Sequence, residues 1–125
     1  MRENGTILLV DDEPNILLAL EFLIQQRGFH VVKANNGSEG IQMARKHQPD
    51  LVILDVMMPG LDGFEVAKAI RKDKQLQNTT IIFLTAKGTN DDFEEGYASG
   101  GEIYLTKPFD NQELINIISE VFEFG

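Results

Sequence analysis

The sequence predicts an α/β domain built on an open, parallel five-stranded sheet. Apolar runs of strand length alternate strictly with segments of helical periodicity, and this alternation is typical of successive βαβ units. The runs from Leu51 to Leu54 and from Ile81 to Leu84 are continuously apolar, as expected for strands covered on both faces. Crossovers between parallel strands are right-handed, so only a few doubly wound strand orders are possible. We therefore expect three layers, with the sheet between two layers of helices.

Five strands and five helices account for most of residues 1–125, which we expect to form one domain. The strands are expected at Thr6 to Val10, His30 to Ala34, Leu51 to Leu54, Thr80 to Leu84 and Ile103 to Leu105. The helices are expected from Pro14 to about Arg27, Asn36 to Lys46, Gly63 to about Asp73, Asp91 to Ser99, and Asp110 through Phe122. Capping residues support these starts: Asn36 with Glu39, Asp62, and Asp110 with Glu113. The segment from Asp91 to Ser99 is the weakest helix, because it has few apolar residues and contains Gly96.

Composition and charge restrict the classes of partner and compartment. The chain has 20 acidic and 11 basic residues, a formal net charge of −9, so direct binding to nucleic acid or to an anionic membrane is not expected. It has no cysteine, which excludes a disulfide framework and a thiolate metal site. No signal peptide and no membrane-spanning run of about 20 apolar residues is visible. We therefore expect a cytoplasmic protein.

Polar residues follow the predicted strands at the same end of each strand. Asp11 and Asp12 follow the first strand, Asp55 ends the third, Thr85 follows the fourth and Lys107 follows the fifth. In an open parallel sheet, ligands bind in the crevice outside the carboxyl ends of the strands. We therefore expect these five side chains to meet at one edge and to form the functional site.

Four motifs at these strand ends, taken in order, resemble one known family. They are Val10-Asp11-Asp12-Glu13-Pro14, Leu54 through Gly63, Leu84-Thr85-Ala86 and Tyr104 through Phe109. The pattern resembles the receiver domain of two-component response regulators, of the chemotaxis-regulator type, and it extends from Ile7 to Val121. The resemblance implies a flavodoxin-like fold with strand order 2-1-3-4-5. It also implies a phosphorylation-dependent signalling switch.

The resemblance assigns a metal-dependent phosphorylation to the acidic residues. Asp55 would be the phosphoacceptor, a nucleophile that becomes an aspartyl phosphate. Asp12 and Asp55 would ligate Mg²⁺ directly, Asp11 mostly through water, and the backbone carbonyl of Met57 would complete the protein ligands. The resemblance also implies that Mn²⁺ would substitute for Mg²⁺. The Met57 side chain is not expected to be a ligand, because a soft thioether does not suit a hard cation.

The resemblance gives the remaining strand-end residues roles in catalysis and switching. Lys107 would pair with a phosphoryl oxygen as a point charge. Thr85 would donate its hydroxyl to another phosphoryl oxygen, which draws the following loop inward. Tyr104 would then turn into the space that Thr85 vacates. A simpler interpretation of Tyr104, as a packing residue with an exposed hydroxyl, remains open.

The resemblance also implies partners. The phosphoryl donor would be a sensor histidine kinase or a histidine phosphotransfer protein, and slow autodephosphorylation would reset the switch. The output would pass to a downstream protein or effector domain through the face formed by the fourth helix, fifth strand and fifth helix. The chain would not turn over external substrates, so it is not an enzyme in the usual sense. It would be a monomer or a phosphorylation-dependent dimer, either a stand-alone receiver or a fragment of a longer protein.

Three other functions compete with the switch. A phosphatase with an aspartyl-phosphate intermediate would need a second Asp two residues after the nucleophile, where this chain has Met57. A flavin- or nucleotide-binding domain would need a Gly-rich phosphate cradle after the first strand, where this chain has Asp11-Asp12-Glu13-Pro14. A phosphorylation-independent interaction module on the same fold is the third alternative. Asp11 and Asp12 could also be a plain turn and helix cap.

Overall fold

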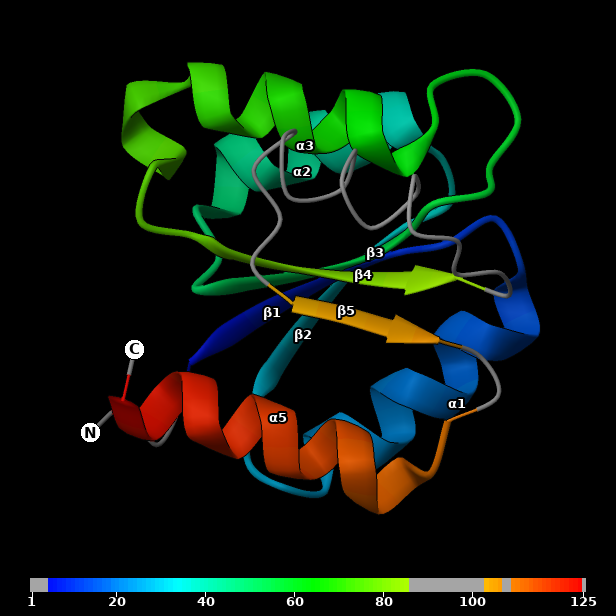
Figure 1. Cartoon of the computed structure of the whole chain (residues 1–125), viewed down its shortest axis with the longest axis vertical. Helices are drawn as coiled ribbons and strands as arrows, with labels where there is room; N and C mark the ends of the chain where they lie inside the picture. The colour runs from blue at the N-terminus through cyan, green and yellow to red at the C-terminus, as the bar shows by residue number, and fades with distance from the viewer. Residues whose placement is uncertain (1–4, 86–102, 107–108, 125) are drawn as a thin grey trace.

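A parallel five-stranded sheet forms the middle layer of the molecule (Figure 1). The computed structural model describes residues 5–85, 103–106 and 109–124, with the backbone alone for Thr85 and Phe124. The strands are β1 (Thr6–Val10), β2 (His30–Ala34), β3 (Leu51–Asp55), β4 (Thr80–Thr85) and β5 (Ile103–Thr106). Their order is β2-β1-β3-β4-β5, and all four pairings are parallel. The predicted strand order is therefore confirmed, and β3 lies at the centre of the sheet.

Helices cover both faces of this sheet. The described α-helices are α1 (Pro14–Gln25), α2 (Gly37–His47), α3 (Gly63–Lys72) and α5 (Asn111–Phe124). Figure 1 shows α2 and α3 on one face and α1 and α5 on the other. All five residues of β3 are buried, which explains why this strand is a continuous apolar run. The predicted helix from Asp91 to Ser99 lies outside the described residues.

Each face of the sheet has its own hydrophobic core. The core under α2 and α3 combines Val52 and Phe83 of the sheet with Val66 and Ile70 of α3, all nearly inaccessible to solvent. The core on the other face combines inward residues of the same strands with helix residues such as Leu20. Successive residues of a strand point to opposite faces, so each strand contributes to both cores. Among the described residues, no helix is long and apolar enough to cross a membrane.

The helix starts follow the capping residues seen in the sequence. Pro14 is the first residue of α1, and Asn36 caps α2 by accepting a hydrogen bond from the Glu39 backbone N–H at 2.8 Å. Asp62 and Glu65 form a reciprocal capping box at the start of α3. Capping residues satisfy backbone N–H groups that the first helical turn cannot pair internally. They therefore fix where α2 and α3 begin, whereas Pro14 marks the start of α1 without a side-chain cap.

Some boundaries differ from the prediction for local reasons. Helix α1 ends at Gln25, two residues before the predicted Arg27. The backbone N–H groups that follow donate to carbonyls of the last helical turn, and the chain then leaves the helix through Gly28 at φ 90°. Asp110 caps α5 through the Gln112 N–H at 2.9 Å. A short 3₁₀ helix at Lys74–Leu76, which was not predicted, connects α3 to β4.

Candidate functional site

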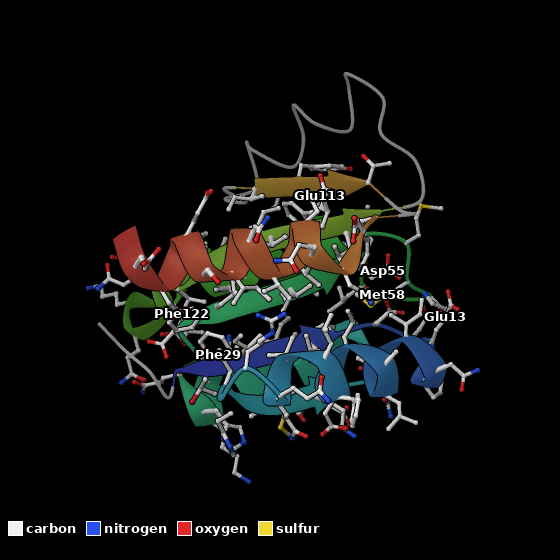
Figure 2. All side chains as sticks on the ribbon, turned by 90° about the horizontal axis from the view of Figure 1, so that it is seen from below. Glu13, Phe29, Asp55, Met58, Glu113 and Phe122 are labelled. Atoms are coloured by element: carbon white, nitrogen blue, oxygen red, sulfur yellow. The ribbon has the colours of Figure 1, made fainter. Side chains whose placement is uncertain are left out.

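Three carboxylates meet at the carboxyl ends of β1 and β3. Ligand oxygens of Asp11, Asp12 and Asp55 all lie within 4.8 Å of one another. The side chains of Asp11 and Asp55 are nearly buried, at 3% and 4% exposure, whereas Asp12 is exposed. In Figure 2, Asp55 lies at the same end of the molecule as Glu13, the residue that precedes α1. The structure therefore brings together the three predicted acidic residues, although Asp11 and Asp55 are 44 positions apart in sequence (55 − 11).

Backbone hydrogen bonds hold the two strand ends that carry these carboxylates. The Asp11 N–H donates to the Ala34 carbonyl at 3.2 Å, which continues the β1–β2 pairing past the last β1 residue. The Val56 N–H donates to the Leu84 carbonyl at 3.0 Å, which continues the β3–β4 pairing in the same way. Both acidic positions are thus part of the extended sheet rather than of loose loops. Their backbone positions are fixed by the central strands.

The side chains are oriented by the turns that follow them. Asp11 accepts a hydrogen bond from the Glu13 N–H at 2.9 Å, and Asp55 accepts one from the Met57 N–H at 3.3 Å. Each carboxylate therefore bonds the backbone two residues ahead, which is the geometry of an Asx turn. Such bonds restrict the rotamers of the carboxylates. They leave the carboxylates close together at the rim of the sheet.

Gly63 allows α3 to start directly against the strand that carries Asp55. A Cβ atom at this position would lie 2.5 Å from the Asp55 carbonyl oxygen and 2.9 Å from the Val56 Cα. Real Cβ atoms essentially never approach so closely, and both obstacles are backbone atoms. The Gly63 N–H also donates to the Val56 carbonyl at 3.0 Å. The sequence places Gly63 at a helix start, but only the structure shows that its missing side chain sets the distance between α3 and the site.

The arrangement suits a hard divalent cation. Three clustered carboxylates repel one another, and two unit charges at the 4.8 Å upper limit of the cluster repel by roughly 0.9 kcal/mol at an effective dielectric constant of 80 and by roughly 3.5 kcal/mol at 20. Carboxylate oxygens are the ligands that Mg²⁺ prefers, usually with several waters retained. The residues therefore fit the predicted metal. The Met57 side chain is 65% exposed, while the role of its carbonyl stays a prediction.

The predicted switch residues are only partly described. Thr85 ends β4 and pairs with Thr106 of β5, and its backbone alone is described. Tyr104 is half-buried, with its ring 5.8 Å from the Phe83 ring and its hydroxyl oxygen shielded from solvent. The packing of Tyr104 therefore differs from that of a surface tyrosine with an exposed hydroxyl. Lys107 and Pro108 lie outside the described residues, so the role of Lys107 stays a prediction.

An exposed apolar surface on α1 was not identified from the sequence. Leu18 and Phe22 are 62% and 65% exposed and lie four residues apart, so they share one face of the helix. The opposite face buries Leu17, Leu20 and Ile24 in the core. The sequence did contain an indication of this exposed apolar face. Leu18 and Phe22 are apolar but lie outside the stripe of apolar residues that packs against the core. Exposed apolar side chains of this size often mark contacts with other proteins.

Comparison with known proteins supplies the family. The family model named response regulator receiver domain matches residues 7–119 of the chain. The chain belongs to this family. Receiver domains are phosphorylation-dependent signalling switches that interact with histidine kinases and downstream effectors. The predicted family and fold are therefore confirmed, and the acidic cluster agrees with that function.

Individual relatives agree with this assignment. Protein PilH of Pseudomonas aeruginosa is 37% identical over 115 residues, which cover 92% of this chain and 95% of PilH. The structure of the chemotaxis protein CheY4 of Vibrio cholerae has a TM-score of 0.90 and 34% identity, and covers 94% of this chain and 98% of that one. The transcriptional regulatory protein PhoP of Bacillus subtilis is 40% identical over 111 residues. These cover 89% of this chain but only 45% of PhoP. The chain thus spans nearly all of some relatives and about half of others.

Proposed function

We propose that this receiver domain accepts a phosphoryl group on Asp55 in a Mg²⁺-dependent reaction. The observation that carries the proposal is the cluster of Asp11, Asp12 and Asp55, whose ligand oxygens lie within 4.8 Å of one another. Asp55 is the member at the end of the central strand, where the turn fixes its carboxylate. A metal ion at Asp11, Asp12 and Asp55, and at the Met57 carbonyl, would neutralise charge on the transferred group when bound.

The proposed step is a direct transfer between two side chains. A carboxylate oxygen of Asp55 attacks the phosphorus atom of a phosphohistidine, an O–P bond forms, and the P–N bond to the donor imidazole breaks. The electron pair of that bond stays on the imidazole nitrogen, which then takes a proton from solvent. Lys107 and Thr85 would contact the phosphoryl oxygens, and Tyr104 would respond to the shift of Thr85. Attack by water on the aspartyl phosphate would reset the domain slowly.

The donor protein would dock on α1 beside the site. The exposed side chains of Leu18 and Phe22 lie on one face of α1, the helix that follows Asp11 and Asp12 directly. Met57, also 65% exposed, lies two residues after Asp55. The phosphohistidine must reach Asp55 at this end of the sheet, so the donor protein would cover both Asp55 and the exposed face of α1. We name Leu18, Phe22 and Met57 the α1 docking surface.

The output would use a different side of the molecule. Strand β5 and helix α5, with the segment from Asp91 to Ser99, would form the face that reads the state of Thr85 and Tyr104. The downstream partner is a protein or an effector domain, and the domain acts as a monomer or as a phosphorylation-dependent dimer. Residues 1–125 would act as one domain in the cytoplasm, without turnover of external substrates.

The test is intact mass spectrometry after incubation with acetyl phosphate, with and without Mg²⁺. We expect one phosphoryl adduct in the wild type, which depends on Mg²⁺ and is lost in Asp55→Asn. The matched control is Glu13→Gln, which also removes one carboxylate at the same end of the molecule but outside the cluster, and should keep the adduct. An adduct that survives in Asp55→Asn would contradict the assignment of the phosphoacceptor. The absence of any adduct, together with no response to beryllofluoride, would favour a phosphorylation-independent interaction module.

A further inference from the structure

Gly37, the first residue of α2, lies directly against the loop that follows Asp55. A Cβ atom at Gly37 would lie 2.8 Å from both the Cβ atom and the carbonyl oxygen of Leu61, and 2.9 Å from a methyl carbon of Val66. A flexible side-chain end could move away from such an overlap, but the two Leu61 atoms belong to the backbone or adjoin it. Helix α2 and this loop can therefore be so close only because residue 37 has no side chain. We call residues 56–62, between β3 and α3, the β3–α3 loop.

Backbone conformation does not explain the glycine at this position. Among the described glycines, Gly28 and Gly60 have positive φ angles and Gly37 does not. Its backbone conformation is therefore open to any residue. Glycine at a helical position also costs stability relative to alanine, because it loses more conformational freedom on folding. What alanine could not provide is the close approach of α2 to Leu61, so we attribute the glycine to this contact.

The contact with Gly37 supports the far side of a loop whose base is already fixed. At the base, the Val56 N–H donates to the Leu84 carbonyl at 3.0 Å, and the Gly63 N–H donates to the Val56 carbonyl at 3.0 Å. Leu61 is half-buried and packs against the core under α2 and α3. Because the base is held by these bonds, a displacement of Leu61 by a side chain at position 37 would be absorbed inside the loop.

Met57, the second residue of the loop, links it to the acidic cluster. Its N–H donates to an Asp55 carboxylate oxygen at 3.3 Å, and its carbonyl is the proposed backbone ligand of the cation. Figure 2 shows the following residue, Met58, at the same end of the molecule as Asp55. Mg²⁺ requires near-ideal octahedral geometry, whereas Ca²⁺ accepts about six to eight oxygen ligands in flexible arrangements. A small displacement of the loop would therefore weaken the binding of Mg²⁺ more than that of Ca²⁺.

We propose that Gly37 is a positioning residue of the cation site. It allows Leu61 to pack against α2, and this contact holds the β3–α3 loop where Met57 meets the carboxylates. The role deepens the proposed function and rests on it, because the Met57 carbonyl is a proposed ligand. Gly37 would thus favour Mg²⁺ without touching it.

The affinities for Mg²⁺ and Ca²⁺ test the proposal. Both Kd values are measured by calorimetric titration of the metal-free protein. In Gly37→Ala, the Kd for Mg²⁺ should rise about tenfold, at the lower end of the range for groups that orient metal ligands. The Kd for Ca²⁺ should change by less than about threefold, because Ca²⁺ accepts a displaced ligand. A merely structural role of Gly37 would not alter the preference between the two cations.

Two further variants separate positioning from stability. Ile70→Val removes one methyl group from the same core, near the other end of α3, and should leave both Kd values unchanged. Leu61→Gly removes the side chain that packs against Gly37 and introduces no overlap, so it should also weaken Mg²⁺ binding more than Ca²⁺ binding. Circular dichroism shows whether each variant is folded, and Leu61→Gly provides the test if Gly37→Ala is not.

Amide hydrogen exchange of the metal-free protein gives a readout that needs no cation. The Met57 N–H should exchange faster in Gly37→Ala than in the wild type and in Ile70→Val, because its bond to Asp55 depends on the position of the loop. Equal Mg²⁺ affinity and equal Met57 exchange in Gly37→Ala and the wild type would overturn the inference and leave the proposed function intact. An equal loss of affinity for both cations would overturn it as well. A wild type that binds no Mg²⁺ would instead contradict the proposed cation site, and the inference with it.

Discussion

Replacing Asp55 by Asn should stabilise the domain when no divalent cation is present. The change removes one of three clustered charges but keeps the oxygen that accepts the hydrogen bond from the Met57 N–H. It also leaves the volume of the side chain almost unchanged, so packing against the buried neighbours is preserved. The dominant effect is therefore electrostatic, and its sign follows from the mutual repulsion of the carboxylates.

The geometry gives the magnitude. Unit charges 4.8 Å apart interact by roughly 0.9 kcal/mol at a dielectric constant of 80 and by roughly 3.5 kcal/mol at 20. Asp12 is exposed and its charge is screened by solvent, whereas Asp11 is nearly buried, so we expect a net gain of about 1–3 kcal/mol. Unfolding entropy scales with length, and for 125 residues 1 kcal/mol corresponds to about 4 °C. The Tm should therefore rise by about 4–12 °C.

Thermal unfolding in EDTA and in Mg²⁺ checks this reasoning. A cation that binds only the folded state stabilises by RT ln(1 + [L]/Kd), about 2.7 kcal/mol at a hundredfold excess over Kd. The wild type should gain this stability in Mg²⁺, while Asp55→Asn should gain little, so the difference between them narrows or inverts. Glu13→Gln, outside the cluster, should behave as the wild type. An Asp55→Asn protein that is less stable than the wild type in EDTA would refute the electrostatic argument.

Three further substitutions test the surroundings of the site. Gly63→Ala should lower the free energy of unfolding in urea by about 1–3 kcal/mol, because the added Cβ would meet backbone atoms. Gly40→Ala should cost less, because its Cβ would meet Val10 side-chain atoms at 3.0 Å. An equal loss of stability in the two variants would contradict the reasoning. Phe22→Ser should slow phosphotransfer from a cognate kinase about tenfold and leave labelling by acetyl phosphate unchanged. If the rates of both reactions fell together, Phe22 would have no specific role in docking. Asp62→Ala should lower the Tm by about 4 °C, because a capping residue contributes roughly 1 kcal/mol to stability. An unchanged Tm would show that this cap does not stabilise the fold.

The sequence predicts where the acidic residues lie in the fold because that position depends on topology alone. Carboxyl ends of adjacent parallel strands meet at one edge, so Asp11, Asp12 and Asp55 become neighbours in the strand order 2-1-3-4-5, which the family resemblance implied. The caps at Asn36 and Asp62 could also be predicted from the sequence, because a capping bond spans only three residues.

Other features depend on distances that no pattern encodes. No sequence pattern indicates that Asp11 is buried while its neighbour Asp12 is exposed. The close approach at Gly63 depends on how α3 packs, although its position at a helix start was predicted. The 3₁₀ helix at Lys74–Leu76 was missed because three residues carry no periodicity.

The pairing of β1 with β3 has a consequence for the order of events during folding. Asp11 and Asp12 directly follow β1, and Asp55 ends β3. Asp11 and Asp55 are 44 residues apart in sequence (55 − 11), and the parallel register from Ile7 with Leu51 to Val10 with Leu54 brings them together. Closing so long a loop is slow compared with forming a local helix. A nascent chain therefore cannot gather the cation ligands until β3 has been synthesised and has docked on β1. Binding of the cation would then require that β3 has paired with β1. Metal binding followed over time during refolding would therefore show when the centre of the sheet forms.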